Sequence, residues 1–185
     1  MSNELKSIAV YCGHEFGHNP AFAREAAVIG EFLGKNKIRM VFGGGDVGLM
    51  GTVATAALDA GGEVVGVSTA NVIEKQEPVH NGVQVEIVDG VNERKQKMFE
   101  LSDAFIILPG GIGTLNELTD IMTMQQIGES KKPLFFLNTD GFWIPFVRLF
   151  IHMKNNGFIE SIHDYNIHGA NTADDLIHRI IKYQN

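Results

Sequence analysis

The sequence predicts an α/β domain built on a parallel sheet, and two observations support this prediction. Short apolar runs recur along the 185 residues, and stretches with helical spacing lie between most of them. Strands that alternate with helices imply crossover connections, and hence a doubly wound, Rossmann-like parallel sheet flanked by helices. No linker, charge block or repeat interrupts the pattern, so residues 1–185 are expected to form a single domain.

Six runs of strand length are rich in β-branched, aromatic or other apolar residues, as buried strands are. They cover residues 7–11, 39–42, 63–68, 83–88, 104–108 and 133–137. Six stretches have helical spacing or a helix-forming composition, namely 20–36, 48–59, 92–102, 114–127, 142–156 and 172–183. The longest segment expected to be irregular is 69–82.

Composition narrows the class of ligand. A net charge of −7 and a pI near 5.4 argue against a nucleic-acid-binding surface, which needs clustered Lys and Arg. No apolar run approaches the roughly 18 residues of a membrane helix. Cys12 has no cysteine to pair with, and the first six residues lack a signal-peptide pattern. A cytoplasmic protein with a small-molecule ligand is therefore expected.

A first glycine-rich loop, residues 43–51, follows a strand and opens a helix, where free N–H groups and the helix dipole favour an anion. Gly44, Gly45 and Gly48 are its candidate ligand contacts. The loop also spells G-x-G-x-x-G, with Glu63 about 20 residues on, which is formally a dinucleotide fingerprint. Nicotinamide binding and a purely structural tight turn both stay open. A Walker loop is excluded because no Gly-Lys-Ser/Thr follows.

A second loop, residues 108–117, again joins a strand to a helix start. Helical spacing stacks Glu117 one turn above Gly113 and Thr114, beside the positive end of the helix dipole. The dipole is expected to keep this carboxylate ionised, so that it could bind ribose hydroxyls or stabilise an oxocarbenium-like transition state. The alternative is a first-turn Glu that only complements the dipole.

Arg94 shares a helix face with Met98 and Leu101, the face expected to turn toward the sheet. A charge there needs a partner, which could be a phosphate, a leaving base or an acidic neighbour in a structural ion pair. By spacing alone, the neighbouring Lys95 and Lys97 look like ordinary solvated charges.

These residues together resemble a known family. Residues 109–117, Pro-Gly-Gly-Ile-Gly-Thr-Leu-Asn-Glu, are similar to the P-G-G-x-G-T-x-x-E signature of LONELY GUY proteins, and Arg94-Lys95 lies at their upstream Arg-Lys pair. The resemblance extends to residues 10–13, 17, 19–20, 43–51, 126–128, 132–133 and 137–138.

The resemblance implies a phosphoribohydrolase that splits a purine nucleoside 5′-monophosphate, AMP or its N6-prenylated cytokinin form, into the free base and ribose 5-phosphate. It implies no cofactor and no metal, a homodimer, and Arg94 and Glu117 as the catalytic pair. The resemblance also implies a set of substrate contacts, namely Lys95, Gly110, Gly111, Gly113, Thr114 and Thr123. Glu77 resembles a further binding carboxylate of the family, although the local length of the chain differs there.

The sequence departs from the family pattern at two places near the expected pocket. His14-Glu15 stands where many members have Ser-Ser, and Val91-Asn92 stands where they usually have Met-His. These departures bear on base preference and rate. Two rivals remain: a non-catalytic carrier of nucleotide or molybdenum cofactor, since related carriers share the glycine signature, and a nicotinamide-dependent oxidoreductase. A zinc site at His14 and His18 is disfavoured, because both are expected to precede the first helix.

Overall fold

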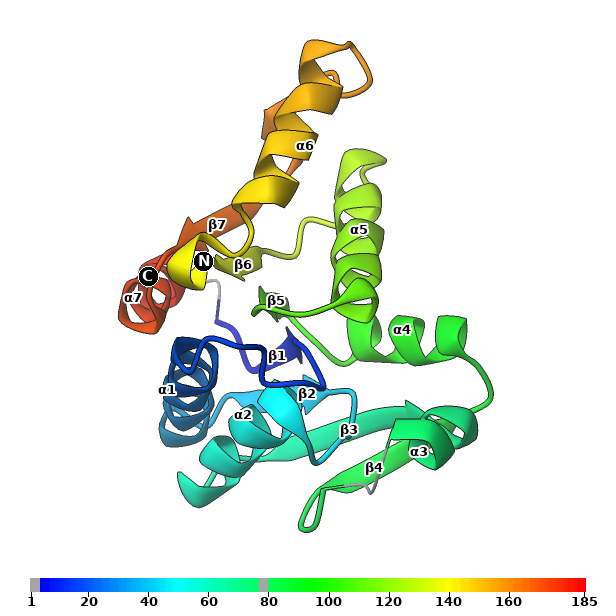
Figure 1. Cartoon of the computed structure of the whole chain (residues 1–185), viewed down its shortest axis with the longest axis vertical. Helices are drawn as coiled ribbons and strands as arrows, with labels where there is room; N and C mark the ends of the chain where they lie inside the picture. The colour runs from blue at the N-terminus through cyan, green and yellow to red at the C-terminus, as the bar shows by residue number, and fades with distance from the viewer. Residues whose placement is uncertain (1–3, 77–79) are drawn as a thin grey trace.

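The sheet has seven strands, all parallel, in the order β4-β3-β2-β1-β5-β6-β7 (Figure 1). The structure, a computed structural model, describes residues 4–76 and 80–185. It confirms the predicted doubly wound α/β fold. The strands are β1 (Ser7–Tyr11), β2 (Arg39–Phe42), β3 (Val64–Thr69), β4 (Gln84–Val88), β5 (Ala104–Ile107), β6 (Leu134–Leu137) and β7 (Ile167–Ala170).

Helices connect the strands. They are α1 (Ala21–Lys35), α2 (Gly48–Asp59), α3 (Ala70–Gln76), α4 (Val91–Glu100), α5 (Ile112–Gln126), α6 (Ile144–Asn155) and α7 (Ala173–Gln184), with short 3-10 turns at Thr139–Gly141 and Ile162–Asp164. All six predicted strands and all six predicted helices are present. The seventh strand was not predicted, and the expectation that 69–82 is irregular was wrong, because α3 begins directly after β3.

Strand residues alternate between two apolar layers. Ile8 and Val10 of β1 belong to the cluster formed with α1, α2 and α7, whereas Ala9 and Tyr11 belong to the cluster formed with α4, α5 and the start of α6. Figure 1 shows the same division, with α1, α2 and α7 on one face of the sheet and α4 and α5 on the other. The period of two along each strand thus produces a three-layer α/β/α core.

Helices α1 and α2 approach each other closely because small residues line their contact. A Cβ added at Gly30 would lie 2.3 Å from the Val53 carbonyl oxygen, and one at Gly34 would lie 2.4 Å from the Ala57 carbonyl oxygen. Real Cβ atoms do not approach so closely. These two glycines are therefore required by packing rather than by backbone conformation.

The chain changes direction in the sheet between β1 and β5, which are hydrogen-bonded neighbours. The helix after β1 covers one face and the helix after β5 covers the other (Figure 1). In open α/β sheets such a switch point leaves a crevice beyond the carboxyl ends of the strands, where ligands bind. Both loops that lead away from this point are rich in glycine.

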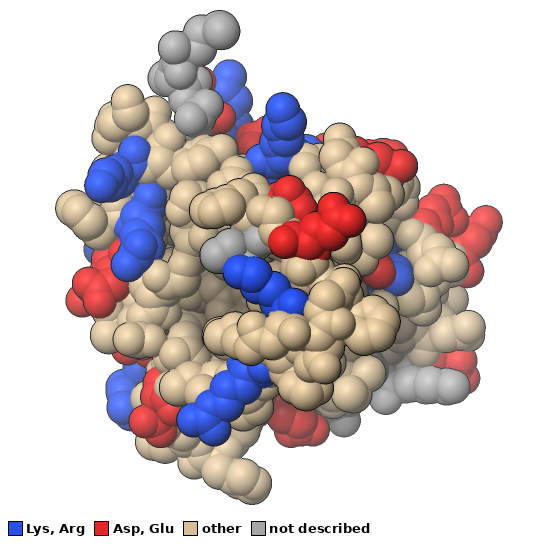
Figure 2. All heavy atoms as spheres, turned by 90° about the horizontal axis from the view of Figure 1, so that it is seen from above, with Lys and Arg blue, Asp and Glu red and all other residues tan. Residues whose placement is uncertain are grey.

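The surface carries charges of both signs. Figure 2 shows basic and acidic side chains scattered over one face of the molecule, without a continuous basic area. Within residues 4–76 and 80–185, no helix is long and apolar enough to cross a membrane.

Candidate active site

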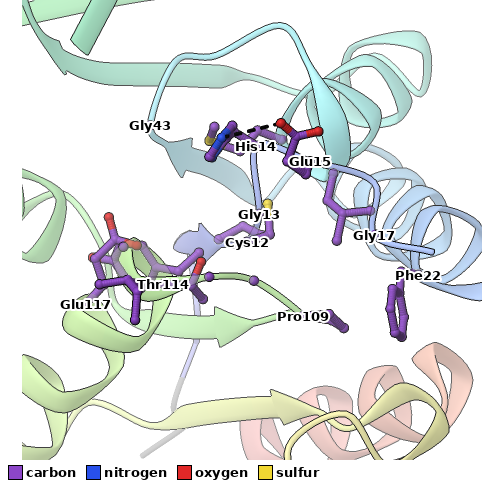
Figure 3. A pocket seen from close by; sticks show the side chains of 18 of the residues that line it. Cys12, Gly13, His14, Glu15, Gly17, Phe22, Gly43, Pro109, Thr114 and Glu117 are labelled. Atoms are coloured by element: carbon purple, nitrogen blue, oxygen red, sulfur yellow. Dashed lines mark ion pairs between the residues drawn. The ribbon is translucent and has the colours of Figure 1, made fainter. Parts of the chain in front are cut away.

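The loops after β1, β2 and β5 meet at the switch point and are joined by backbone hydrogen bonds. The Gly13 amide donates to the Pro109 carbonyl oxygen at 3.0 Å, and the amides of Leu49 and Met50 donate to the Gly13 carbonyl oxygen at 3.1 and 3.3 Å. A cavity of about 460 Å³ opens between them, which is within the size range of small-molecule sites. Figure 3 shows Thr114 and Glu117 on one side of it and Phe22 on the other.

The first turn of α5 presents amide groups at this cavity. The Leu115 amide makes the first intrahelical bond, to Gly111, so the amides of residues 112–114 have no partner within the helix. No side chain caps this end of α5. A Cβ at Gly111 or Gly113 would meet nothing within 4 Å, so no described part of the chain needs glycine there. The arrangement leaves both donors and room for an anion.

Gly110 has a different reason to be glycine. A Cβ there would lie 2.2 Å from Thr114 Oγ1 and 2.9 Å from the Gly13 amide nitrogen. Thr114 itself is buried, with 3% of its surface exposed. Gly110 therefore lets Thr114 pack inward against the loop that follows β1. All four residues predicted from the second loop, Gly110, Gly111, Gly113 and Thr114, line the cavity.

The first glycine loop is partly engaged by the loop after β1. The amides of Leu49 and Met50, in the first turn of α2, bond to the Gly13 carbonyl oxygen, so these two of the N–H groups expected there for an anion already have a partner. Gly44, Gly45 and Gly48 line neither this cavity nor the one next to it. Gly48 has a φ of +61°, and its Cβ would lie 2.1 Å from the His14 carbonyl oxygen. That glycine serves the contact between two loops.

Arg94 reaches the cavity from α4 because Gly43 makes way for it. A Cβ at Gly43 would lie 2.3 Å from Arg94 Nη2. Arg94 Nε donates to the Val67 carbonyl oxygen at 2.9 Å, which fixes the guanidinium plane at the end of β3. The predicted orientation of this helix face is confirmed, since Met98 on the same face is fully buried. Gly43, which the sequence did not single out as a ligand contact, is thus a glycine of the first loop that borders both the cavity and Arg94.

Glu117 is the acidic partner of Arg94. Its Oε1 lies 3.5 Å from Arg94 Nη1, and the two side chains are only 11% and 15% exposed. Burial raises the pKa of Glu117 to about 7, with a further increase from Asp120, while Arg94 and Lys95 act in the opposite direction. The expectation that the helix dipole keeps this carboxylate fully ionised is therefore wrong, because desolvation outweighs the neighbouring positive charges. Glu117 exchanges protons close to neutral pH.

A second cavity, of about 390 Å³, lies on the other side of Glu117. Tyr11 and Glu117 line both cavities, whereas Lys95 and Thr123 line only the second. Lys95 is not the solvated charge that its spacing suggested: its side chain is 20% exposed, and Nζ lies 2.5 Å from Asp120 Oδ2. Thr123 donates its hydroxyl to the Thr119 carbonyl oxygen at 2.8 Å. Glu77 lies outside the described residues.

Tyr11 is a site residue that the sequence analysis did not identify, and Cys12, whose place at the end of a strand allowed it to border a pocket, does so. Tyr11 is the last residue of β1, Cys12 follows it, and both residues line the first cavity. Burial raises the pKa of the Tyr11 phenol, with Glu117 next in size, and burial likewise raises the pKa of the Cys12 thiol. Tyr11 therefore stays a protonated hydrogen-bond donor, and Cys12 stays a neutral thiol. Its position inside an apolar run hid Tyr11 from pattern analysis.

The mouth of the first cavity combines charged and aromatic groups. His14 and Glu15 form an exposed pair, with His14 Nε2 3.7 Å from Glu15 Oε1 (Figure 3). The rings of Phe22 and Phe142 meet edge to face, with centroids 5.5 Å apart, and Phe16 beside them is 55% exposed. A ligand whose phosphate lies at α5 would have its other end in this apolar part of the cavity.

Glu63 does not belong to this site. Its Oε1 accepts a hydrogen bond from Arg39 Nε at 2.7 Å on the surface, where the side chains are 60% and 42% exposed. The acidic residue required by the dinucleotide fingerprint is thus engaged elsewhere, which removes the main support for nicotinamide binding.

Comparison with known proteins places the chain in a family. A family model described as "Possible lysine decarboxylase" matches residues 50–180. A relative from Oryza sativa subsp. japonica, a cytokinin riboside 5′-monophosphate phosphoribohydrolase named LOG, is 38% identical over 184 residues, which are 98% of this chain and 75% of the relative. This chain belongs to the LONELY GUY family. A second LONELY GUY relative, a cytokinin riboside 5′-monophosphate phosphoribohydrolase from Rhodococcoides fascians, is 39% identical over 155 residues, 83% of this chain and 78% of its own.

Solved structures share the fold of this LONELY GUY chain at lower sequence identity. A molybdenum cofactor binding protein from Rippkaea orientalis superposes with a TM-score of 0.72 at 22% identity, covering 97% of each chain. A molybdenum cofactor carrier protein from Chlamydomonas reinhardtii gives a TM-score of 0.70 at 17% identity, covering 97% of this chain and 98% of its own. The superpositions show a shared fold, and at this sequence identity they show nothing of the function.

Proposed function

We propose that this protein hydrolyses the N-glycosidic bond of a purine nucleoside 5′-monophosphate, releasing the base and ribose 5-phosphate. The observation that carries the proposal is the meeting of Arg94 and Glu117, 3.5 Å apart and largely buried, beside the uncapped first turn of α5. The relatives that cover most of this chain are named as phosphoribohydrolases of cytokinin riboside 5′-monophosphates. AMP and its N6-substituted forms are the proposed substrates.

The phosphate would occupy the first turn of α5. The amides of residues 112–114 and the positive end of the helix dipole favour an anion at that place, and Gly111 and Gly113 leave space for it. The base would then extend toward Phe22 and Phe142, where an aromatic lining suits a flat heteroaromatic ring. Any N6 substituent would lie near His14 and Glu15, at the open end.

The reaction breaks the bond between C1′ and the base nitrogen and forms a bond between C1′ and a water oxygen. Ionised Glu117 would stabilise the positive charge that develops on the ribose and accept a proton from the attacking water. The departing base nitrogen takes up one proton from solvent, and Glu117 returns its proton to solvent before the next turnover. Arg94, held by Val67, would orient the substrate and favour the departing base. Ionisation of Glu117 near pH 7 suits this role, because the group can then take up and release a proton in each turnover.

The test is incubation of the purified protein with AMP, isopentenyl-AMP, GMP and CMP, with chromatographic detection of base and ribose 5-phosphate. The purine nucleotides should release their base, and Glu117→Gln should lower turnover by more than about a hundredfold while binding persists. Glu63→Gln is the matched control, since it removes a carboxylate on the surface. Near-normal turnover by Glu117→Gln would overturn the proposal. The rate should also rise as the pH is raised through about 7, because Glu117 loses its proton in that range.

Two other functions are less well supported. A lysine decarboxylase would use a lysine to hold pyridoxal phosphate, and no lysine lines the first cavity in the described chain. A carrier of nucleotide or molybdenum cofactor has the support of the fold alone. Measurable binding of nucleotides without release of base from any of them would favour the carrier.

The proposal includes a homodimer in a reducing compartment such as the cytoplasm. Helix α6 supports the dimer, since none of its residues is buried although it carries Ile144, Val147, Leu149 and Ile151. The free thiol of Cys12 supports the compartment. Light scattering after size-exclusion chromatography should give twice the chain mass of 20.3 kDa. A monomer at micromolar concentration would refute the dimer.

A further inference from the structure

Two ion pairs connect α4 with α5 side by side, and they differ in tightness. Arg94 and Glu117 approach to 3.5 Å, which is an ion pair without a good hydrogen bond. The next residue on α4, Lys95, lies 2.5 Å from Asp120, one turn further along α5. Lys95 Nζ also donates to Asn116 Oδ1 at 3.1 Å. The tighter pair thus stands immediately beside the looser one.

The amino group of Lys95 is already engaged by the protein. An ammonium group has three donors, and two of them have partners on α5. Lys95 and Asp120 line the second cavity and do not line the first, where the uncapped turn of α5 lies. This geometry fits a connection between helices better than a direct contact with the phosphate of a substrate.

Helix α4 packs on the core through its C-terminal half. Met98 is buried in the apolar cluster that includes Leu118 and Ile121 of α5, and Phe99 stacks on Phe105 of β5 with centroids 5.4 Å apart. Arg94, nearer the start of the helix, is tied to β3 through the Val67 carbonyl oxygen. At that end of α4 the ties to α5 are polar, and besides the looser pair of Arg94 with Glu117 they are the contacts of Lys95 with Asp120 and Asn116.

We propose that Asp120 is a positioning residue, which through Lys95 fixes the spacing between Arg94 and Glu117 at the site. For its activity readout this inference rests on the proposed hydrolase function. A small displacement of a reacting group carries a large cost, because an error of about 1 Å is worth roughly a hundredfold in rate. Loss of the connection should therefore reduce turnover without abolishing it.

The experiment compares Asp120→Asn, Lys95→Gln and the double variant, with AMP as substrate. Each single variant should lower kcat by about tenfold with KM changed by less than about threefold, and the double variant should be no slower than either single one. Asp120→Glu should restore most of the rate. The pH limb should move to lower pH in Asp120→Asn, which loses the negative charge that raises the pKa of Glu117, and to higher pH in Lys95→Gln.

A matched control lies on the same helix. Lys97 and Glu86 form an ion pair of 2.9 Å between α4 and β4, and neither residue lines either cavity. Lys97→Gln and Glu86→Gln should leave kcat unchanged. If Asp120→Asn behaves like these controls, or if Lys95→Gln raises KM more than about tenfold while Asp120→Asn has no effect, the inference is overturned.

The failure of this inference can be distinguished from the failure of the proposed function. If the wild-type protein releases no base, the hydrolase proposal fails, and the connection between helices is then tested by urea unfolding. Asp120→Asn and Lys95→Gln should each lower the unfolding midpoint, and the double variant should lower it by less than the sum of the two shifts. Additive shifts would overturn the connection itself.

Discussion

Replacement of Glu117 by Gln should change how stability depends on pH, whatever the substrate. The side chain is 11% exposed, and its pKa rises from 4.5 to about 7 in the folded protein. A group whose pKa is raised on folding stabilises the protein fully below its unfolded pKa, and this contribution is lost as the pH rises through the folded value. The difference amounts to about 3 kcal/mol at about pH 8, and most of it is lost between about pH 5 and pH 8.

Glutamine has nearly the same shape but cannot ionise, so this part of the pH dependence should disappear in Glu117→Gln. Urea unfolding of both proteins at several pH values, followed by the fluorescence of Trp143 and by circular dichroism, measures it. Trp143 is the one tryptophan in the sequence and is buried, so its emission reports the loss of the core around β6 and α6. The wild type should lose about 2–3 kcal/mol more than the variant between about pH 5 and pH 8. Parallel curves would refute the assignment of a raised pKa to Glu117.

Two further predictions test the active site and the packing of α1 against α2. Tyr11→Phe removes a hydroxyl donor from a residue that lines both cavities, and it should lower kcat by about five- to tenfold. That decrease corresponds to one hydrogen bond of about 1 kcal/mol. A rate equal to that of the wild type would exclude Tyr11 from the reaction. Gly30→Ala should lower the free energy of unfolding by about 1–3 kcal/mol, since its Cβ would lie 2.3 Å from the Val53 carbonyl oxygen. Gly169→Ala, where a Cβ meets nothing within 4 Å, is the control, and equal effects of the two changes in thermal unfolding would contradict the packing argument.

The order of strands and helices was predictable because each buried strand is a run of apolar residues with its own flanking helix. The segment Ile167–Ala170 escaped prediction for a physical reason. As an edge strand it reads Ile-His-Gly-Ala and buries only Ala170, so neither alternation nor an apolar run marks it. The short helix Ala70–Gln76 escaped because it spans only 7 residues, and because its N-terminal cap, Thr69, whose hydroxyl oxygen accepts from the Val72 amide at 3.3 Å, is also the last residue of a strand.

The site was predictable where a motif carries the chemistry, and less so where the chemistry depends on tertiary contacts. Arg94 and Glu117 were found from spacing and resemblance, and the structure brings them together. The pKa of Glu117 could not be derived from its place in a helix, because it depends on burial against β1 and α4. Asp120 could not be identified either, since a charged residue in the middle of a helix has the pattern of a solvated one until its partner is known.

The contact between Gly48 and the loop after β1 involves only backbone atoms on the loop side, namely the His14 carbonyl group and the Glu15 amide nitrogen. The side chains of His14 and Glu15 are half or more exposed and carry no part of that joint. Residues 14 and 15 can therefore vary without disturbing the contact between the loops after β1 and β2, beside which Arg94, Glu117 and the first turn of α5 lie. Side chains that border the first cavity at these two positions could therefore be exchanged at little cost in folding.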